Sequence, residues 1–226
     1  MNILWCITGA GHFLNDVVGF MKRISKENRI TAIFSGAGYE VAMMYGILGG
    51  IEKISRDIIL ESEQGYSAPI VGRFAKREYD IIIIAPCTAN TVAKIVHGIA
   101  DSLVSNIAAQ SMKSGVPVYV LPTDAKKEQK TGIPLSINPE KCRNCNECIP
   151  MEICPKSAFY RSDRVRINLL KCDACLSCID KCEYGTITFG QKVWIRMRDI
   201  DIENVEKLKK MRGLEVVEKL DGSILS

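Results

Sequence analysis

Two runs of closely spaced cysteines constrain this chain of 226 residues more than any other feature. The first run reads KCRNCNECIPMEICP over 141–155, and the second reads KCDACLSCIDKC over 171–182. Together they hold eight of the ten cysteines. No amino-terminal basic segment leads into an apolar stretch, and no apolar run is long enough to span a bilayer, so we expect a cytoplasmic protein. In that compartment such spacing indicates metal ligands rather than disulfides.

The intervals within these runs predict iron–sulfur clusters. Three cysteines at two-residue intervals surround one cube, and the fourth thiolate of each run ligates the other cube. We therefore predict two [4Fe–4S] clusters, and residues 138–190 resemble bacterial two-cluster ferredoxins. A zinc ribbon, the alternative, uses two pairs and has no place for a third cysteine at the same interval. The predicted ligand sets are Cys142, Cys145, Cys148 and Cys182 for one cluster and Cys172, Cys175, Cys178 and Cys154 for the other.

Apolar, β-branched runs alternate with helical patterns in the first half of the chain. Continuous apolar strands separated by helices predict a parallel sheet covered on both faces, which is a doubly wound α/β domain. The predicted strands span 2–8, 29–35, 57–62, 80–86 and 117–122.

The α/β pattern stops near Thr123 and a strand, helix and strand pattern returns from residue 193. This tail is too short for its own core, so we expect it to pack back on the α/β domain. The predicted α/β domain therefore spans 1–137 and 191–226, with 138–190 as an inserted iron–sulfur module. A tail that packs on the module instead is the alternative.

The segment TGAGHFLND at 8–16 joins the first strand to the first helix. Backbone N–H groups at such a turn favour a phosphate. A dinucleotide fingerprint needs a third glycine, where this chain has Leu14, and a carboxylate after the second strand, where it has Ser35 and Gly36. The turn therefore favours a mononucleotide, although structural glycines are also common at such turns.

A second candidate segment, IIAPCTANTVAKIVHGIADSL, spans 83–103. A buried strand here gives way to small and polar residues at the carboxyl edge of the sheet, where ligands bind in such folds. Helix capping by Thr88 or Asn90 explains the same residues, and the two interpretations stay open at this point.

The segment over 85–103 resembles the motif of the flavin-binding family that includes the flavin-containing cysteine decarboxylases. The resemblance implies FMN, a flavodoxin-like sheet and homo-oligomers built from trimers. By that resemblance, the phosphate and ribityl groups would contact Gly9, Ala10, Gly11, Ser35 and Thr88, with His12 and Gly36 beside them. The flavin ring would be bordered by Pro86, Cys87, Ala89, Asn90, Thr91, Asp101 and Ser102.

Flavin and two clusters in one chain resemble the archaeal-type dihydromethanopterin reductases, which serve one-carbon metabolism. The resemblance implies that a ferredoxin-like donor supplies electrons through the clusters to FMN, which reduces the C=N bond of a dihydropterin. Clusters carry single electrons whereas a C=N bond takes a pair with a proton, and FMN converts between the two. The alternatives are an electron-transfer flavoprotein without a small-molecule substrate and a flavin-dependent cysteine decarboxylase.

Candidate proton donors lie near the glycine turn and in the segment LESEQGYSAP at 60–69. We name His12, Glu63 and Tyr66 as candidates, each with a structural role as the alternative.

Cys87 and Cys6 are expected to fill space in the core. The net charge of +4 is too small to indicate nucleic-acid binding, so we expect neither nucleic acid nor membrane as a partner.

Overall fold

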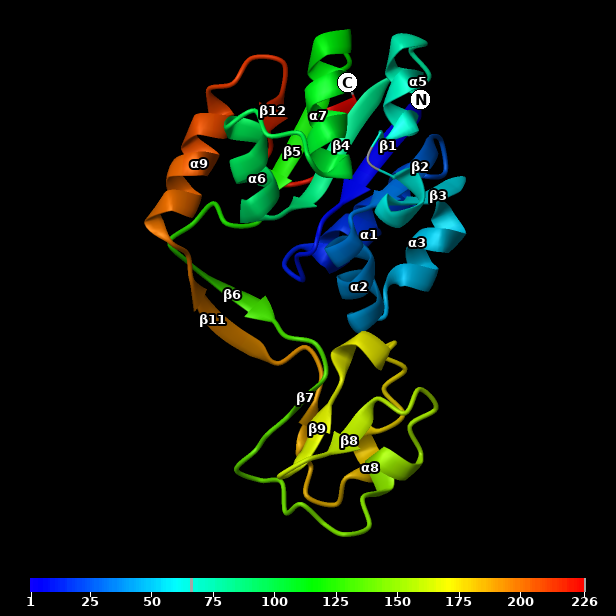
Figure 1. Ribbon diagram of the computed structural model, residues 1–226, viewed down its shortest axis with the longest axis vertical. Coiled ribbons are helices and arrows are strands. Elements are labelled where there is room, and N and C mark those ends of the chain that lie inside the picture. The colour runs from blue at the N-terminus through cyan, green and yellow to red at the C-terminus, as the bar shows by residue number, and fades with distance from the viewer. Residues whose placement is uncertain (66, 226) are drawn as a thin grey trace.

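The apolar runs of the sequence pair into one six-stranded parallel sheet (Figure 1). The computed structural model describes residues 1–65 and 67–225. Every neighbouring pair of strands in this sheet is parallel, which confirms the predicted α/β class. In spatial order the strands are β12 (Glu215–Val216), β5 (Val118–Pro122), β4 (Ile81–Cys87), β1 (Asn2–Ile7), β2 (Arg29–Phe34) and β3 (Asp57–Leu60).

The strand order reverses between β1 and β4. From β1 the chain moves outward through β2 and β3, then returns to the other side of β1 and moves outward through β4, β5 and β12. Without the short edge strand β3, this is the flavodoxin-like order. In such sheets ligands bind outside the carboxyl ends of the two strands at the reversal, so β1 and β4 mark the expected site.

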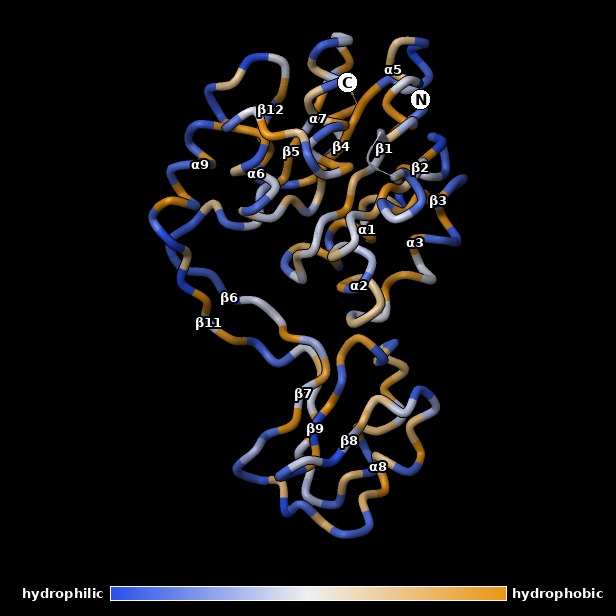
Figure 2. Tube along the Cα trace, viewed as in Figure 1, coloured by the Kyte–Doolittle hydropathy of each residue, from blue (hydrophilic) through white to orange (hydrophobic). Residues whose placement is uncertain are grey.

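Helices cover both faces of the sheet. Side chains of β1, β2 and β4 alternate between two apolar cores, and the interior strands are the most apolar part of the trace (Figure 2). One face carries α1 (Leu14–Ile24), α2 (Gly36–Met44), α3 (Leu48–Ile54) and the 3₁₀ helix η4 (Gly222–Leu225). The other carries η1 (Pro69–Val71), α5 (Gly72–Ala75), α6 (Ala89–Val96), α7 (Leu103–Ser114) and α9 (Asp199–Lys209).

The cysteine runs lie in a smaller body, which a two-stranded ribbon joins to the sheet (Figure 1). The ribbon pairs β6 (Glu128–Gly132) with β11 (Lys192–Arg196) in antiparallel fashion. A small apolar core that includes Phe159, Val165 and Ile187 organises the body. Its elements are β7 (Ser136–Ile137), α8 (Ile149–Glu152), β8 (Phe159–Arg161), β9 (Val165–Ile167), η2 (Leu169–Lys171), η3 (Ile179–Lys181) and β10 (Ile187–Thr188).

The returning tail follows the predicted pattern with one difference. Helix α9 and strand β12 pack on the sheet domain, but β11 pairs with β6 outside the sheet. Strand β11 therefore belongs to the ribbon and not to the sheet. The strand predicted over 57–62 is also shorter, because Glu61 begins the one-turn helix α4 (Glu61–Gln64). Over residues 1–65 and 67–225, no helix combines the length and apolar character needed to cross a bilayer.

The amino terminus of α9 holds an ion pair between the buried Asp201 and the exposed Arg198. Asp201 accepts hydrogen bonds from the Arg198 side chain at 2.7 and 2.9 Å and from its backbone N–H at 3.3 Å. The Arg198 guanidinium holds the pKa of the Asp201 carboxyl below its usual value. The ionised carboxylate thus caps the helix that brings the chain back to the sheet.

We predict that Asp201→Asn lowers the free energy of unfolding by about 1 kcal/mol at neutral pH. The folded pKa lies below the unfolded one, so this stabilisation is present above the ordinary aspartate pKa and is lost as the pH falls through the folded pKa. Unfolding midpoints of parent and variant, followed by circular dichroism, should therefore converge below about pH 4. A difference that is independent of pH would contradict the assigned role.

Candidate functional site

One hydroxyl group ties together the ends of the two central strands. Thr8, buried directly after β1, donates to the carbonyl oxygen of Pro86 at 2.7 Å and accepts the N–H of Thr88 at 2.9 Å. The glycine turn and the segment over 85–91 therefore form one continuous site at the carboxyl edge of the sheet. The sequence reasoning missed Thr8, although a hydroxyl at the end of the first strand is a usable signal.

Close backbone packing requires two glycines in the turn. A Cβ on Gly9 would lie 2.6 Å from the Cβ of Ala37, at the start of α2. A Cβ on Gly11 would collide with the ring and hydroxyl of Tyr45, directly after α2. The glycine turn thus packs against both ends of α2. This close packing explains why both positions are glycine, whether or not a ligand binds there.

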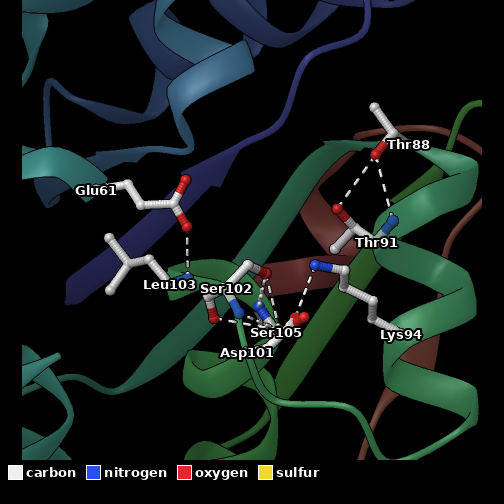
Figure 3. Close-up of polar contacts among 8 residues, drawn as sticks. All are labelled: Glu61, Thr88, Thr91, Lys94, Asp101, Ser102, Leu103 and Ser105. Atoms are coloured by element: carbon white, nitrogen blue, oxygen red, sulfur yellow. Dashed lines mark hydrogen bonds and ion pairs between the residues drawn. The ribbon is translucent and has the colours of Figure 1, made fainter. Parts of the chain in front are cut away.

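Three predicted site residues begin helices at this edge. Ser35 accepts the N–H of Gly38 at 3.0 Å as the cap of α2. Thr88 accepts the N–H of Thr91 at 3.3 Å as the cap of α6 (Figure 3). Ser102 caps α7 through a reciprocal arrangement with Ser105. The capping interpretation of Thr88 is therefore correct, and it leaves a cluster of hydroxyl groups and helix amino termini beside the turn.

Glu61 connects two of these helix starts across the sheet edge. One carboxylate oxygen accepts the N–H of Gly36 at 2.9 Å. The other accepts the N–H of Leu103 at 2.7 Å (Figure 3). A negative charge at two helix amino termini is favourable. Glu61 therefore holds the start of α2 and the start of α7 in register and already occupies the N–H of Gly36.

The remaining motif residues are more exposed. Asp101 accepts a hydrogen bond from Lys94 at 2.7 Å, which lowers the pKa of the Asp101 carboxyl (Figure 3). Asn90 is exposed in the first turn of α6. Ala89 donates its N–H to Asp124 at 3.1 Å. Asp124 also lies beside the glycine turn, since its charge acts on His12.

His12 lines a cavity of about 410 Å³ that opens beside the turn. Burial lowers the pKa of the half-buried imidazole, and the nearby Asp124 carboxylate only partly offsets this. The ring is therefore mostly neutral at pH 7 and can both donate and accept a hydrogen bond. Three lysines and two glutamates share the cavity wall: Lys126, Lys130, Lys209, Glu128 and Glu218.

The other predicted residues are placed as follows. Glu63 is exposed, and its carboxylate accepts the N–H of Leu60 at 3.2 Å. Tyr66 lies outside the described residues. Cys6 and Cys87 are wholly buried, and burial raises the pKa of each thiol far above its usual value. Both therefore fill the core as neutral thiols, and the carbonyl oxygen of Cys87 already accepts the N–H and the hydroxyl of Thr123.

The structure brings each predicted set of four cysteines together. A small cavity is lined by Cys142, Cys145, Cys148 and Cys182, together with apolar side chains such as Phe159 and Val165. In the other set, burial raises the pKa of the Cys178 thiol to about 11, and the neighbouring thiols of Cys172, Cys154 and Cys175 add to the shift. Each run thus contributes its last cysteine to the group formed by the other run.

The loops between these cysteines have an unusual backbone. Asn144, Ala174 and Leu176 have positive φ angles of 51°, 53° and 62°, a region that few residues other than glycine occupy. A residue with positive φ next to a residue in the right-handed helical region forms a nest, a concave group of backbone N–H groups, and nests are common at iron–sulfur sites. One N–H group, that of Ala158, already points at the sulfur of Cys154 at 3.4 Å.

Over residues 1–65 and 67–225, no three His, Cys, Asp or Glu side chains converge on one point, as a single metal ion would require. In a [4Fe–4S] cluster each cysteine sulfur binds a different iron atom, so the four sulfurs surround the cluster and do not converge on one metal ion. The two groups fit that requirement in residue type, number and loop conformation. Ligation by them stays a prediction.

We predict that Glu61→Ala lowers the free energy of unfolding by about 1–2 kcal/mol, because two helix-start N–H groups lose their acceptor. Glu63→Ala is the matched control, since it removes one longer hydrogen bond from an exposed carboxylate in the same helix. The control should change stability by less than about 0.5 kcal/mol. Denaturant unfolding measures both, and equal effects would show that Glu61 does not bridge the two helices.

Comparison with known proteins gives three findings. A model of the family described as Flavoprotein matches residues 1–132. The dihydromethanopterin reductase (acceptor) of Methanosarcina mazei is 41% identical, with 96% of this chain and 94% of that protein covered. The protein of the same name from Methanocaldococcus jannaschii is 42% identical, with 96% of this chain and 92% of that protein covered.

A solved structure shares the fold over nearly the whole chain. The FMN complex of Burkholderia xenovorans DmrB, described as a cubic protein cage for redox transfer, has a TM-score of 0.63 and 24% identity. The likeness covers 97% of this chain and 89% of that chain. The chain therefore belongs to the Flavoprotein family, as the motif over 85–103 predicted, and within it to the dihydromethanopterin reductases (acceptor), as that motif together with the cysteine runs predicted.

Proposed function

We propose that this chain is an iron–sulfur flavoprotein that reduces a dihydropterin of the dihydromethanopterin class to its tetrahydro form, with electrons from a ferredoxin-like donor. One observation carries the proposal. The likeness to two dihydromethanopterin reductases covers 96% of the chain, so it extends well beyond residue 132, where the Flavoprotein match ends, into the cysteine-rich part. Bound FMN would exchange single electrons with clusters and an electron pair with a C=N bond.

The carboxyl edge of the sheet supplies the groups that FMN would need. The glycine turn and the amino termini of α2 and α6 lie together there, which suits a phosphate. Phosphate and ribityl contacts are assigned to Gly9, Ala10, Gly11, Ser35 and Thr88. The ring is assigned to the segment that follows Pro86 and to the start of α7 at Ser102, with the buried Cys87 as a packing residue.

The eight cysteines of the two runs would hold two [4Fe–4S] clusters in the crossed sets described above. The support is their grouping into fours, each with its own loop nests. Thiols buried beside one another resist ionisation, whereas a bound metal deprotonates them outright. We accordingly propose 138–190 as the electron-transfer module, to which the adjoining β7 also contributes, and the rest of 1–137 with 191–226 as the flavin domain, in a cytoplasmic protein.

The cavity beside His12 is the proposed substrate site. Its volume of about 410 Å³ falls within the range of small-molecule sites, and it adjoins the glycine turn through His12 and Phe13. The neutral imidazole can hold a proton close to a heterocycle, while Lys126 and its two lysine neighbours offer donors to carbonyl or anionic groups. His12 is therefore better placed than the exposed Glu63 to serve as the proton donor.

Two alternatives lead to different observations. A pure electron-transfer flavoprotein has no use for the cavity at His12, and a flavin-dependent cysteine decarboxylase has no use for an external electron supply.

We also propose a homo-oligomer built from trimers. The exposed apolar side chains of Trp194, Ile195 and Ile99 support the proposal, since association would cover them.

The function is tested with a Cys172→Ala/Cys175→Ala double variant. This variant should keep FMN and should reduce dihydropterin when a small chemical reductant reduces its flavin directly. Turnover driven by reduced ferredoxin should fall at least about tenfold, a loss equivalent to about 1.4 kcal/mol in the activation free energy. FMN content and oligomer size are matched to the parent.

Unchanged ferredoxin-driven turnover in the variant would refute the relay. A parent protein that transfers electrons rapidly to other proteins but is not reoxidised by any dihydropterin would refute the reductase and favour the electron-transfer flavoprotein. Carbon dioxide release from a cysteine-derived carboxylate, with no need for a reductant, would favour the decarboxylase.

A further inference from the structure

The two residues that follow α2 touch both halves of the molecule. Tyr45 and Gly46 connect α2 to the short turn before α3. On one side they contact the glycine turn of the flavin domain, and on the other the loop of the second cysteine run. Figure 1 shows the lower end of α2 directly above the top of the cysteine module.

Gly46 is the closest point on the module side. Its φ angle is +68°, and a Cβ placed on it would lie 3.2 Å from the Cβ of Ala174 and 3.4 Å from the Ala174 carbonyl oxygen. The carbonyl oxygen of Asp173 would lie 3.6 Å away. Ala174 stands between Cys172 and Cys175, so two of the four second-run thiols flank the contact.

Tyr45 joins the same contact to the flavin turn. Its ring and hydroxyl occupy the space that a side chain on Gly11 would need. The hydroxyl donates to the carbonyl oxygen of Gly132, at the end of the ribbon, at 2.8 Å. The ring meets Phe189 of the module edge-on, with centroids 6.3 Å apart. The half-buried Tyr45 therefore fixes the position of the module relative to the turn.

The first cysteine run faces the other way. Its loop and α8 lie at the end of the module farthest from the sheet (Figure 1). A cavity of about 610 Å³ opens beside Cys142, with the exposed Arg164 and Arg166 in its wall. Further exposed basic residues around this end are Lys141, Arg143 and Arg161. Asp163 pairs with both arginines, and Glu140, Glu147 and Glu152 are exposed at the same end, so the surface carries both signs of charge. Its distance from the sheet is what leaves this end open to a one-electron donor.

We infer that Tyr45 and Gly46 seat the second-run loop against the flavin turn, so that the cluster site of Cys154, Cys172, Cys175 and Cys178 is the flavin-side site. The site of Cys142, Cys145, Cys148 and Cys182 is then the donor-side site. This inference rests on the proposed function and adds to it the direction in which electrons pass through the two clusters. Single electrons leave a reduced ferredoxin-like donor at the end of the module farthest from the sheet, and two such transfers with two protons fully reduce one flavin.

The experiment compares Gly46→Asp with Gly46→Asn. Both residues tolerate a positive φ angle and have the same shape, so the two variants differ only in one negative charge beside Ala174. A nearby negative charge disfavours the addition of an electron and lowers a reduction potential. Redox titrations followed by electron paramagnetic resonance measure each cluster, and the Cys172→Ala/Cys175→Ala variant identifies the second-run signal as the one it loses.

The second-run signal should shift to a more negative potential in Gly46→Asp than in Gly46→Asn, and the first-run signal should shift less. Gly115→Asp is the position control, because Gly115 has a φ angle of +69°, no neighbour within 4 Å and a place at the opposite edge of the sheet. It should shift neither signal. A larger shift of the first-run signal, or no shift of either, would overturn the inference. Failure of the proposed function is a separate outcome: a parent without any cluster signal refutes the clusters, and a parent that no dihydropterin reoxidises refutes the reductase while both signals stay measurable.

Discussion

The parallel pairing of β12 with β5 determines where the rest of the chain can go. Val216 pairs with Val120 in this register, so β12 must start at the same edge as β5. Parallel neighbours cannot be joined by a hairpin, and the chain has to cross back over the sheet between them. Helix α9 makes that crossing, with Val205 and Leu208 packed into the core. The chain between β5 and α9 therefore begins and ends at the carboxyl edge of the sheet, so an insertion there does not disturb the sheet.

This topology explains how the module can be inserted between β5 and α9 and why it lies beside the candidate flavin site. The ribbon of β6 and β11 leaves and returns at the edge where Thr8 joins β1 to β4. The module has only a small apolar core, and its eight cysteines form no disulfide. Bodies of this size commonly depend on metal ligation for stability. The clusters would thus stabilise the module while the sheet domain folds on its own core.

Sequence reasoning succeeded where the pattern of apolar residues is strong. The buried strands β1, β2, β4 and β5 were predicted within one or two residues, because parallel strands are continuous apolar runs. The polar strand β6 was not predicted, since it lies in an exposed ribbon and depends on its partner β11. Contacts between distant segments were also missed. Neither the bridge from Glu61 to two helices nor the fit of Gly46 against Ala174 leaves a local pattern.

Under the proposed function, the cysteine module supplies electrons to the flavin. The most direct measurement mixes the oxidised protein with a reduced ferredoxin-like donor in a stopped-flow instrument, without substrate, and follows cluster and flavin absorbance separately. Cluster reduction should precede flavin reduction, and each chain should finally accept two electrons at the flavin and one at each cluster. Flavin reduction that runs ahead of the clusters, or at the same rate in protein that lacks them, would contradict the claim.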